Sequence, residues 1–208
     1  MSFDISVRKK LGALDLDIRF QSDAGLTAIA GPSGCGKTSL LNMVAGLLRP
    51  DEGHIVVGDE ILFDSARHIA VAVERRSAGY VFQDGRLFPH MRVRDNLLYA
   101  VQLEAGDRHE QGALSDISSF LGIDHLFDRW PATLSGGEVQ RVAIGRALLS
   151  QPRFLLMDEP LGALDTMRRD EIMAMIERIR DEMGLPILYV SHDPSEIGRL
   201  SDNIISIS

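Results

Sequence analysis

The chain has 208 residues, 45% of them hydrophobic, which is enough to bury one sizeable core and fits a single fairly large domain. Its 22 basic and 30 acidic side chains give a formal charge of −8, and because such a surface repels nucleic-acid phosphates, no nucleic-acid partner is expected. The single cysteine, Cys35, excludes a disulfide within the chain, and neither a signal peptide nor a run of about 18 apolar residues is found, so a reducing, cytoplasmic location is expected.

The first predicted elements are three strands and a helix. Phe3–Val7 and Leu14–Phe20 alternate apolar and polar residues, as strands of a half-buried sheet do. Leu26–Ala30 is short, apolar and followed by a glycine-rich turn, which predicts a buried strand. Thr38–Leu48 has apolar residues at helical spacing and stops before Arg49-Pro50, which predicts a helix.

The rest of the chain contains both kinds of element. Phe88–Leu149 lacks strand-like runs and is predicted to be mostly helical, and Met167–Met183 is predicted to be a helix that ends at Gly184. Further strands are predicted at His54–Val57, Gly79–Phe82, Phe154–Met157, Ile187–Val190 and Asn203–Ile207. Strands alternating with helices predict an α/β fold around a parallel sheet.

A glycine-rich segment between the third strand and the first helix carries the Walker A pattern. It consists of Gly31, Pro32, Ser33, Gly34, Cys35, Gly36, Lys37 and Thr38, and Ser39 completes the expected nucleotide-binding set. The backbone N–H groups of such a loop surround phosphate oxygens, and the start of the helix adds its dipole. Lys37 is expected to reach the β- and γ-phosphates of ATP, and the Thr38 hydroxyl to ligate Mg²⁺. Alkylation of Cys35 in this loop is expected to block nucleotide binding.

Two carboxylates follow the apolar strand Phe154–Met157. Asp158 is expected to hold Mg²⁺, directly or through water. Glu159 stands one residue further on, so its side chain points differently, toward an attacking water for which it would be the general base. A solvated strand end is the alternative for this pair alone, but the preceding phosphate loop favours metal binding and catalysis.

A third motif, Leu134-Ser135-Gly136-Gly137-Glu138, resembles the signature motif of the ABC ATPases. Other segments resemble motifs of the same family and occur in the same order. They are Gln83 of the Q-loop, the D-loop Leu161-Gly162-Ala163-Leu164-Asp165, and the switch histidine His192. The resemblance covers essentially the whole chain. It implies a P-loop NTPase fold, with a RecA-like parallel-sheet core, an N-terminal antiparallel β subdomain and an inserted helical subdomain.

The resemblance also implies one nucleotide-binding domain over residues 1–208, with its core in residues 1–83 and 152–208 and its helical subdomain at about 84–151. In that family, a head-to-tail homodimer encloses ATP between the phosphate loop of one copy and the signature motif of the other. Ser135-Gly136-Gly137 stands at a predicted helix start, where N–H groups and the helix dipole form a second anion site.

The resemblance assigns roles to three further residues. His192 would contact the γ-phosphate as a catalytic residue. Gln83 would be both a catalytic residue and a ligand in the Mg²⁺ site, because it senses the γ-phosphate and the ion. Asp165 would lie at the interface between the two copies.

The segment Gly79–Leu97 resembles the importer branch of the family, and most of all the ATPases of molybdate importers. In that branch it helps to form a groove for a short helix of the membrane permease, where Leu87, Phe88 and Met91 would be apolar anchors. The interior of the helical subdomain is the alternative position for these side chains. The resemblance thus implies an ATPase that energises import of molybdate or a similar small oxyanion. It would lie on the cytoplasmic face of the inner membrane, bound to permease subunits and, through them, serving a solute-binding protein.

One feature of many relatives is missing, namely an aromatic residue that stacks on adenine, because Lys9–Ala13 contains none. Weak selectivity between ATP and GTP is therefore expected. Two other functions are weighed against transport. A non-transport ABC ATPase acting on nucleic acid or ribosomes usually has a coiled-coil insertion or a second cassette, and the sequence has neither. A module that binds ATP without turnover would not need Glu159, Gln83 and His192 together.

Overall fold

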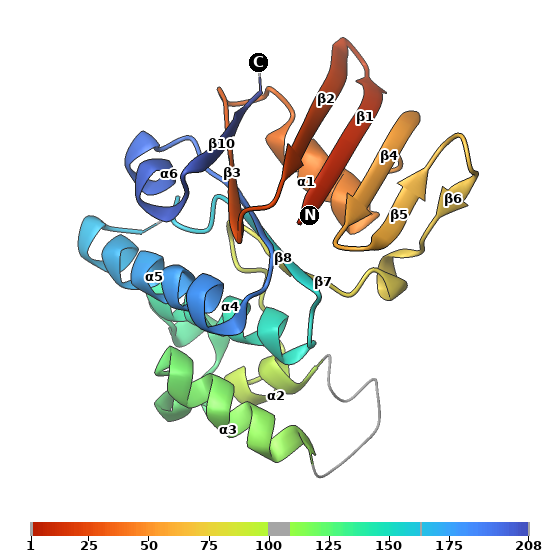
Figure 1. Cartoon of the computed structure of the whole chain (residues 1–208). Helices are drawn as coiled ribbons and strands as arrows, with labels where there is room; N and C mark the ends of the chain where they lie inside the picture. The colour runs from red at the N-terminus through yellow and green to blue at the C-terminus, as the bar shows by residue number, and fades with distance from the viewer. Residues whose placement is uncertain (1, 100–108, 163, 208) are drawn as a thin grey trace.

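The computed structural model describes residues 2–99, 109–162 and 164–207 (Figure 1). Within them lie one antiparallel sheet in the order β2-β1-β4-β5-β6 and one parallel sheet in the order β10-β3-β9-β8-β7. The antiparallel strands are β1 (Phe3–Leu11), β2 (Leu14–Ser22), β4 (Glu52–Val57), β5 (Glu60–Asp64) and β6 (Ile69–Ala70). The parallel strands are β3 (Leu26–Ala30), β7 (Ala78–Val81), β8 (Phe154–Asp158), β9 (Ile187–Val190) and β10 (Asn203–Ser206).

The helices of the described residues pack on the parallel sheet or, for α2 and α3, on helix α4. They are α1 (Lys37–Ala45), α2 (Val93–Leu98), α3 (His109–Leu121), α4 (Gly136–Leu149), α5 (Thr166–Arg178) and α6 (Pro194–Leu200), with 3₁₀ helices at Val73–Arg75, Asp124–Leu126 and Pro131–Thr133. A π-helical turn, Ile179–Met183, continues α5 to Gly184, whose φ of +63° ends it. Along the described residues, we find no helix with the length and apolar character needed to cross a bilayer.

The antiparallel sheet is built from local hairpins. Gly12 and Ala13 close the turn between β1 and β2, and Gly58 and Asp59 close the turn between β4 and β5. Both glycines have positive φ, which tight turns of this kind require. Strands β1 and β2 are longer than predicted, and β5, β6 and α6 lie outside the sequence-based expectation.

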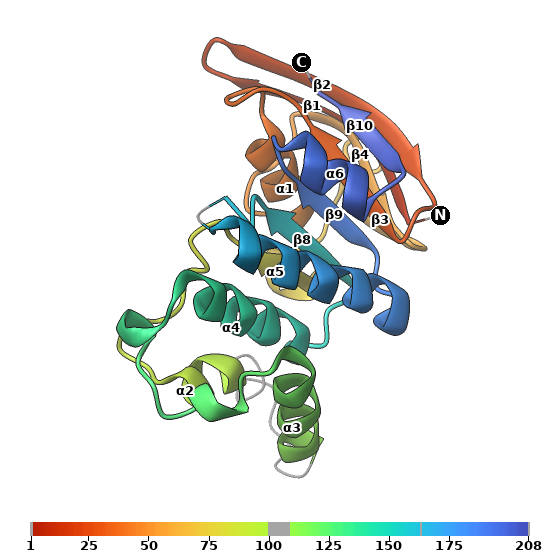
Figure 2. The same cartoon turned by 90° about the vertical axis from the view of Figure 1, so that its left-hand side faces the viewer.

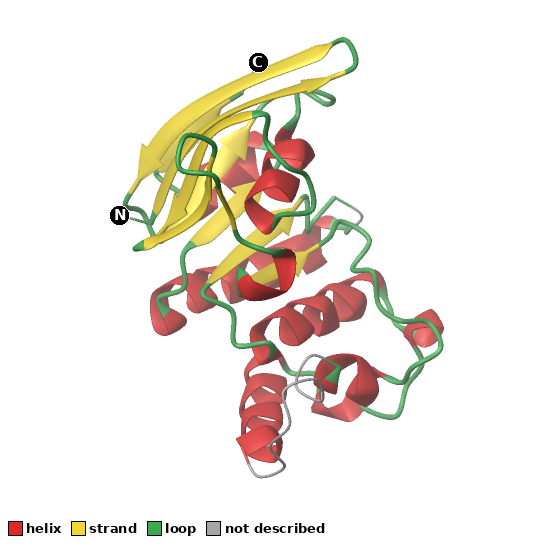
Figure 3. Cartoon of the chain, turned by 90° about the vertical axis from the view of Figure 1, so that its right-hand side faces the viewer, coloured by secondary structure: helices red, strands yellow, loops and turns green. Residues whose placement is uncertain are grey.

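The parallel sheet separates two hydrophobic clusters because successive side chains of a strand point to opposite faces. Phe154 and Leu156 of β8 pack in the cluster that contains α1 and the inner face of the antiparallel sheet. Leu155 and Met157 pack in the cluster that contains α4, α5 and α6. Helix α1 is therefore held between the two sheets, which lie toward one end of the molecule (Figure 3).

The helices α2, α3 and α4 lie toward the other end (Figure 2). Helix α4 contacts α2, α3, α5 and strand β7, so it links the helical region to the sheet. These elements confirm the predicted fold class, a parallel-sheet core with an N-terminal antiparallel sheet and helices inserted between β7 and β8. The boundaries proposed for the helical subdomain, about 84–151, stay a prediction, and part of that range, residues 100–108, lies outside the described residues.

Candidate functional site

Four neighbouring strands of the parallel sheet end beside the candidate site. In the order β3-β9-β8-β7, they are followed by Gly31, Ser191, Glu159 and Phe82. Because the carboxyl ends of parallel strands meet at one edge of a sheet, the topology brings together the phosphate loop, the switch histidine, the acidic pair and the Q-loop segment.

The phosphate loop has glycine at two positions where no side chain fits. Gly36 has a φ of +101°, and a Cβ there would lie 2.4 Å from the side chain of Leu16 on β2. A Cβ at Gly31 would lie 2.4 Å from the carbonyl oxygen of Ile207. Gly36 is therefore required by its positive φ, and Gly31 by its close approach to the backbone of Ile207, which follows β10.

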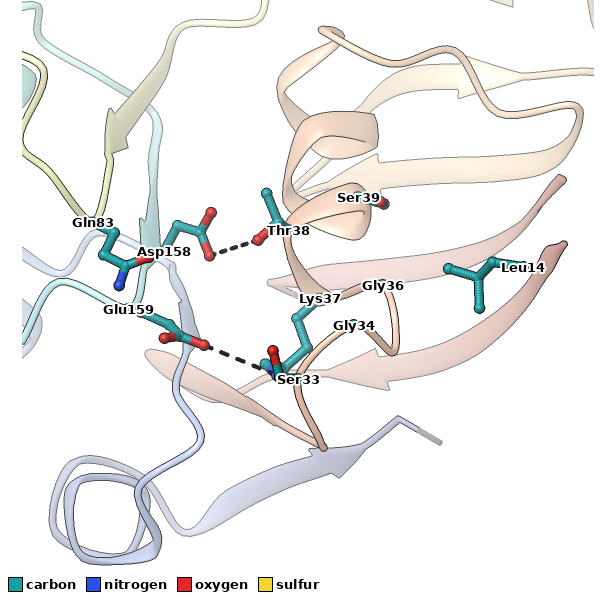
Figure 4. A pocket seen from close by; sticks show the side chains of 10 residues that line it. All are labelled: Leu14, Ser33, Gly34, Gly36, Lys37, Thr38, Ser39, Gln83, Asp158 and Glu159. Carbon is teal, nitrogen blue, oxygen red and sulfur yellow. Dashed lines mark hydrogen bonds and ion pairs between the residues drawn. The ribbon is translucent and has the colours of Figure 1, made fainter. Parts of the chain in front are cut away.

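Lys37 is buried although it is charged, with its side chain 5% exposed. Its ammonium donates hydrogen bonds to the carbonyl oxygens of Gly31 (2.8 Å) and Pro32 (2.9 Å). The same nitrogen lies 4.0 Å from Oε1 of Glu159 (Figure 4). These contacts hold the positive charge between the phosphate loop and the acidic end of β8.

The first residue of the acidic pair, Asp158, is bound to the start of α1. The hydroxyl of Thr38 donates to Oδ1 of Asp158 over 3.1 Å. Burial is the main cause that raises the pKa of Asp158, the hydrogen bond from Thr38 opposes this rise, and the charge of Glu159 adds to it. A hydroxyl and a carboxylate oxygen at one position form a donor set that suits Mg²⁺.

The second residue, Glu159, has a left-handed backbone with a φ of +45°, which is unfavourable for a residue with a Cβ. Its N–H donates to the carbonyl oxygen of Val190 (3.0 Å), and its Oε2 lies 3.1 Å from Nδ1 of His192. The His192 side chain is 61% exposed. This backbone turns the Glu159 carboxylate away from Asp158 and toward Lys37 and His192.

These groups face one cavity of about 390 Å³ (Figure 4). Its lining residues are Leu14, Ser33, Gly34, Gly36, Lys37, Thr38, Ser39, Gln83, Asp158 and Glu159. The structure thus brings together most of the phosphate-loop set, the acidic pair and Gln83. His192 adjoins this cavity through its contact with Glu159.

Of two further residues near this cavity, Cys35 points away from it and Leu14 lines it. Cys35 is buried and packs in the hydrophobic cluster between the two sheets, and the expected effect of its alkylation stays a prediction. Leu14, which sequence reasoning did not single out, is the one apolar side chain among the lining residues. It pairs with Leu11 across the β1–β2 hairpin, which places both side chains on one face.

The signature motif lies apart from the phosphate loop in the single chain. Ser135 caps α4: its N–H donates to Oε2 of Glu138 (2.7 Å), and the N–H of Glu138 donates to its hydroxyl (3.4 Å). The first of these bonds is the main cause that lowers the pKa of Glu138. Ser135 and Gly137 line a separate cavity of about 220 Å³, and Gly136 is exposed.

The expected partner-binding residues occupy intermediate positions. Leu87, Phe88 and Met91 are half-buried, and Leu87 packs on the cluster of α4 and α5. The Phe88 ring lies 4.4 Å from the ring of Tyr99.

In the D-loop, Asp165 caps α5 by accepting from the N–H of Arg168, whereas Ala163 lies outside the described residues.

Sequence reasoning missed two residues of α4 whose side chains bind backbone carbonyl groups next to the site. Gln140 is buried and donates to the carbonyl oxygen of Pro160 (2.5 Å). Arg146 donates to the carbonyl oxygens of Arg86 (2.8 Å) and Gly85 (2.9 Å) in the segment after Gln83. Polar residues on a helix usually face solvent, so helical periodicity alone does not mark these two as buried or bonded. The only signal in the sequence is that they follow the motif Leu134–Glu138 on the same helix.

Comparisons with known proteins agree with this geometry. Residues 15–162 match the family described as ABC transporter. Molybdenum import ATP-binding protein ModC of Brucella suis is 52% identical over 204 residues, covering 98% of this chain and 56% of that protein. The protein of the same name from Rhodospirillum rubrum is 53% identical over 206 residues, covering 99% of this chain and 55% of that protein. The chain thus spans little more than half the length of these relatives.

Solved structures show the same fold. The structure of cbiO1 from Clostridium perfringens, part of the ABC transporter complex cbiONQ, has a TM-score of 0.83 at 28% identity, covering 99% of this chain and 84% of that one. The ATP-binding cassette MJ0796, a dimer in a post-hydrolysis state bound to ADP and Pi, has a TM-score of 0.81 at 27% identity, covering 100% of this chain and 94% of that one.

Proposed function

The chain belongs to the ABC transporter family, and from this premise we propose that it binds and hydrolyses ATP to energise an importer for molybdate or a similar small oxyanion. One observation carries the ATPase activity: a single cavity is lined by the Lys37 side chain, the acidic pair Asp158 and Glu159, and Gln83. The names of the relatives, which share about half of their length with this chain, support the transported substrate.

In this proposal, the loop Gly31–Thr38 holds the β- and γ-phosphates with its N–H groups, aided by the dipole of α1 and the ammonium of Lys37. The Thr38 hydroxyl and the Asp158 carboxylate, which lie 3.1 Å apart, would hold Mg²⁺ together with Gln83. When bound, the ion would offset negative charge on the phosphates.

Glu159 is the proposed general base. Its carboxylate would accept a proton from the water that attacks the γ-phosphate. The contact of 3.1 Å with Nδ1 of His192 would orient this carboxylate. Because its ring is largely exposed at the rim, His192 would also be available to the γ-phosphate.

The second half of the site would come from another copy of the chain in a head-to-tail dimer. Ser135-Gly136-Gly137 begins a 14-residue helix whose N-terminus is suited to bind a phosphate, yet it lines a different cavity from Lys37 in the same chain. The similarity to a dimeric cassette bound to ADP and Pi supports this arrangement. Asp165 would then lie at the interface between the copies.

The partners proposed for transport are permease subunits and, through them, a solute-binding protein. Leu87, Phe88 and Met91 would contact a short permease helix beside α2, which would hold the chain at the cytoplasmic face of the inner membrane. A non-transport role on nucleic acid or ribosomes is less favoured, because the relatives named above are import proteins and the net charge is −8.

Reconstitution tests the transport function. The permease that co-purifies with the chain would be placed in proteoliposomes with ATP on the side of the chain and the solute-binding protein on the opposite side. Uptake of radioactive molybdate would then be measured, with sulfate as a competitor. We expect uptake that depends on ATP and is lost with Glu159→Gln. Molybdate uptake that is equal with and without ATP, or no uptake of any oxyanion by a complex that hydrolyses ATP, would contradict the proposal.

A further inference from the structure

A buried carboxylate lies behind the loop of His192. Glu196, in the first turn of α6, has its side chain 5% exposed. Its Oε2 accepts hydrogen bonds from the hydroxyls of Tyr189 (2.9 Å) and Ser191 (2.7 Å). A buried carboxylate needs such partners, because its charge would otherwise be poorly solvated. None of these three side chains lines the phosphate cavity.

The nearby cation is Arg169, in the first turn of α5. Its Nη1 donates to Oδ2 of Asp193 (3.1 Å) and lies 3.7 Å from Oε1 of Glu196. Its Nε donates to the carbonyl oxygen of Leu164 (2.9 Å). One planar guanidinium therefore joins the segment before α5 to the segment before α6.

These two segments carry the residues that meet in the site. Ser191 and Asp193 flank His192, and both belong to the hydrogen-bond network around Glu196 and Arg169. The carbonyl oxygen of Glu159 accepts from the N–H of Gly162 (3.1 Å), and the N–H of Leu164 donates to the carbonyl oxygen of Leu161 in the same turn (3.1 Å). Arg169 is thus bonded to both segments whose residues Glu159 and His192 contact each other.

We propose that Arg169 is a positioning residue that keeps Glu159 and His192 in contact. It would do so by holding Leu164, which is bonded to the turn of Glu159–Gly162, at a fixed separation from residues 191–193. This inference rests on the proposed ATPase function. Lysine cannot replace arginine here, because an ammonium lacks the rigid fork that donates in two set directions.

The test is Arg169→Lys, which keeps the charge near Glu196 but loses the fork. We expect kcat for ATP to fall by about tenfold or more, while the KM and the affinity for ATP change by less than about twofold, because Arg169 is not a lining residue of the cavity. The control is Arg199→Lys. Arg199 joins the same two helices by pairing with Asp170 and Glu177, but it contacts neither segment, so kcat should stay normal.

A second readout does not depend on turnover. In chain with isotope-labelled histidine, the ring signals of His192, assigned with His192→Gln, should shift in Arg169→Lys and not in Arg199→Lys. If Arg169→Lys does not fold, Arg169→Gln, which also lacks the fork, takes its place in both measurements with the same expected result, and Arg199→Gln becomes its control. An unchanged kcat, or an unmoved His192 signal in the folded variant, would overturn the proposal. Absence of ATPase activity in the unsubstituted chain would contradict the proposed function instead, and the His192 signal would still decide the positioning role.

Discussion

The hydroxyl of Thr38 and the carboxylate of Asp158 form a 3.1 Å hydrogen bond although 120 positions separate them in the sequence. The bond joins the first turn of α1 to the carboxyl end of β8, and it lies at the position where the donor set suits Mg²⁺. The bond also fixes the position of the Asp158 carboxylate, whose pKa is raised by burial and by the nearby charge of Glu159. The charged form of this carboxylate therefore opposes folding in the chain without a bound cation.

The first prediction concerns this cost in the free chain. Because the folded state raises the pKa of Asp158 above its ordinary value of 3.8, the folded chain holds this proton more tightly than the unfolded chain. The stabilisation by the protonated group is complete below 3.8 and is lost as the pH rises through the raised pKa. Asp158→Asn keeps an acceptor for Thr38 and removes the charge. We expect its Tm at neutral pH without Mg²⁺ to be higher by roughly 2–4 °C, the shift that about 1 kcal/mol produces in a domain of this size.

Thermal unfolding over an acidic to neutral pH series, compared between the two proteins, measures this effect. The advantage of Asp158→Asn should shrink as the pH falls below 3.8, where protonation removes the charge of Asp158 in the folded and the unfolded chain. In parallel, Mg²⁺ should increase the affinity for ATP in the unsubstituted chain and not in the variant. A variant that is less stable at neutral pH would contradict the origin of the pKa shift in burial.

The sequence predicted those elements whose signals are local. The apolar runs Leu26–Ala30 and Ile187–Val190 coincide with β3 and β9, since fully buried strands between turns leave continuous apolar segments. Strand β5 was missed, although the Gly58-Asp59 pair is a hairpin signal, because only short apolar runs flank it. Helix α6 has seven residues, too few to show helical periodicity, and only its Asp193-Pro194 start marks it.

Sequence motifs predicted the candidate site residues that belong to one continuous segment each. The phosphate loop, the acidic pair and Gln83 line one cavity, as their order on neighbouring strands implies. Leu14 and Arg169 were not predicted, because one enters the site through a hairpin of the other sheet and the other acts through the Leu164 carbonyl. Such tertiary contacts between distant segments leave no periodicity or spacing in a single sequence.

The second prediction separates catalysis from binding at Glu159. Glu159→Gln keeps the shape of the side chain but cannot accept a proton, so we expect kcat to fall by about 10²–10⁴ while ATP affinity remains within about threefold. Phosphate release and equilibrium binding of ATP measure the two quantities. Near-normal turnover would remove Glu159 from the role of general base.

The third prediction concerns Lys37, which is expected to act in binding itself. Lys37→Ala removes an ammonium held by the carbonyls of Gly31 and Pro32, and a charge-assisted contact to phosphate is worth about 1.5–3 kcal/mol. We expect the Kd for ATP to rise by about 10- to 150-fold. Arg153→Ala, which removes an exposed cation paired with Glu60 elsewhere, should leave the Kd unchanged. Equal affinities of the two variants would contradict the phosphate contact.

The fourth prediction concerns the nucleotide base. With Leu14 as the apolar side chain of the cavity lining, the base would rest on an aliphatic surface that offers no hydrogen bonds to distinguish its edges. ATP and GTP should therefore bind within about tenfold of each other, and Leu14→Ala should weaken both by a similar factor. Leu14→Tyr should strengthen both by stacking. Competition of GTP against labelled ATP measures the ratio, and a strong preference for ATP would exclude an aliphatic base site.

The last prediction tests whether two chains share each nucleotide. Gly136 is exposed at the start of α4, so Gly136→Asp places a negative charge where the partner's γ-phosphate is expected, and an acidic residue is favourable for the helix itself. In a Glu159→Gln background, Gly136→Asp and Lys37→Ala chains should each lose ATP on gel filtration, the first through an impaired signature motif and the second through an impaired phosphate loop. Mixed dimers contain one site in which both halves are intact, so the mixture should retain ATP and elute as a dimer. Gly136→Asn, which adds the same bulk without charge, controls for crowding and should retain more ATP than Gly136→Asp. Full retention of ATP by Gly136→Asp chains alone would contradict the shared site. It would mean that no phosphate of a neighbouring chain lies near residue 136, so that each chain encloses ATP by itself.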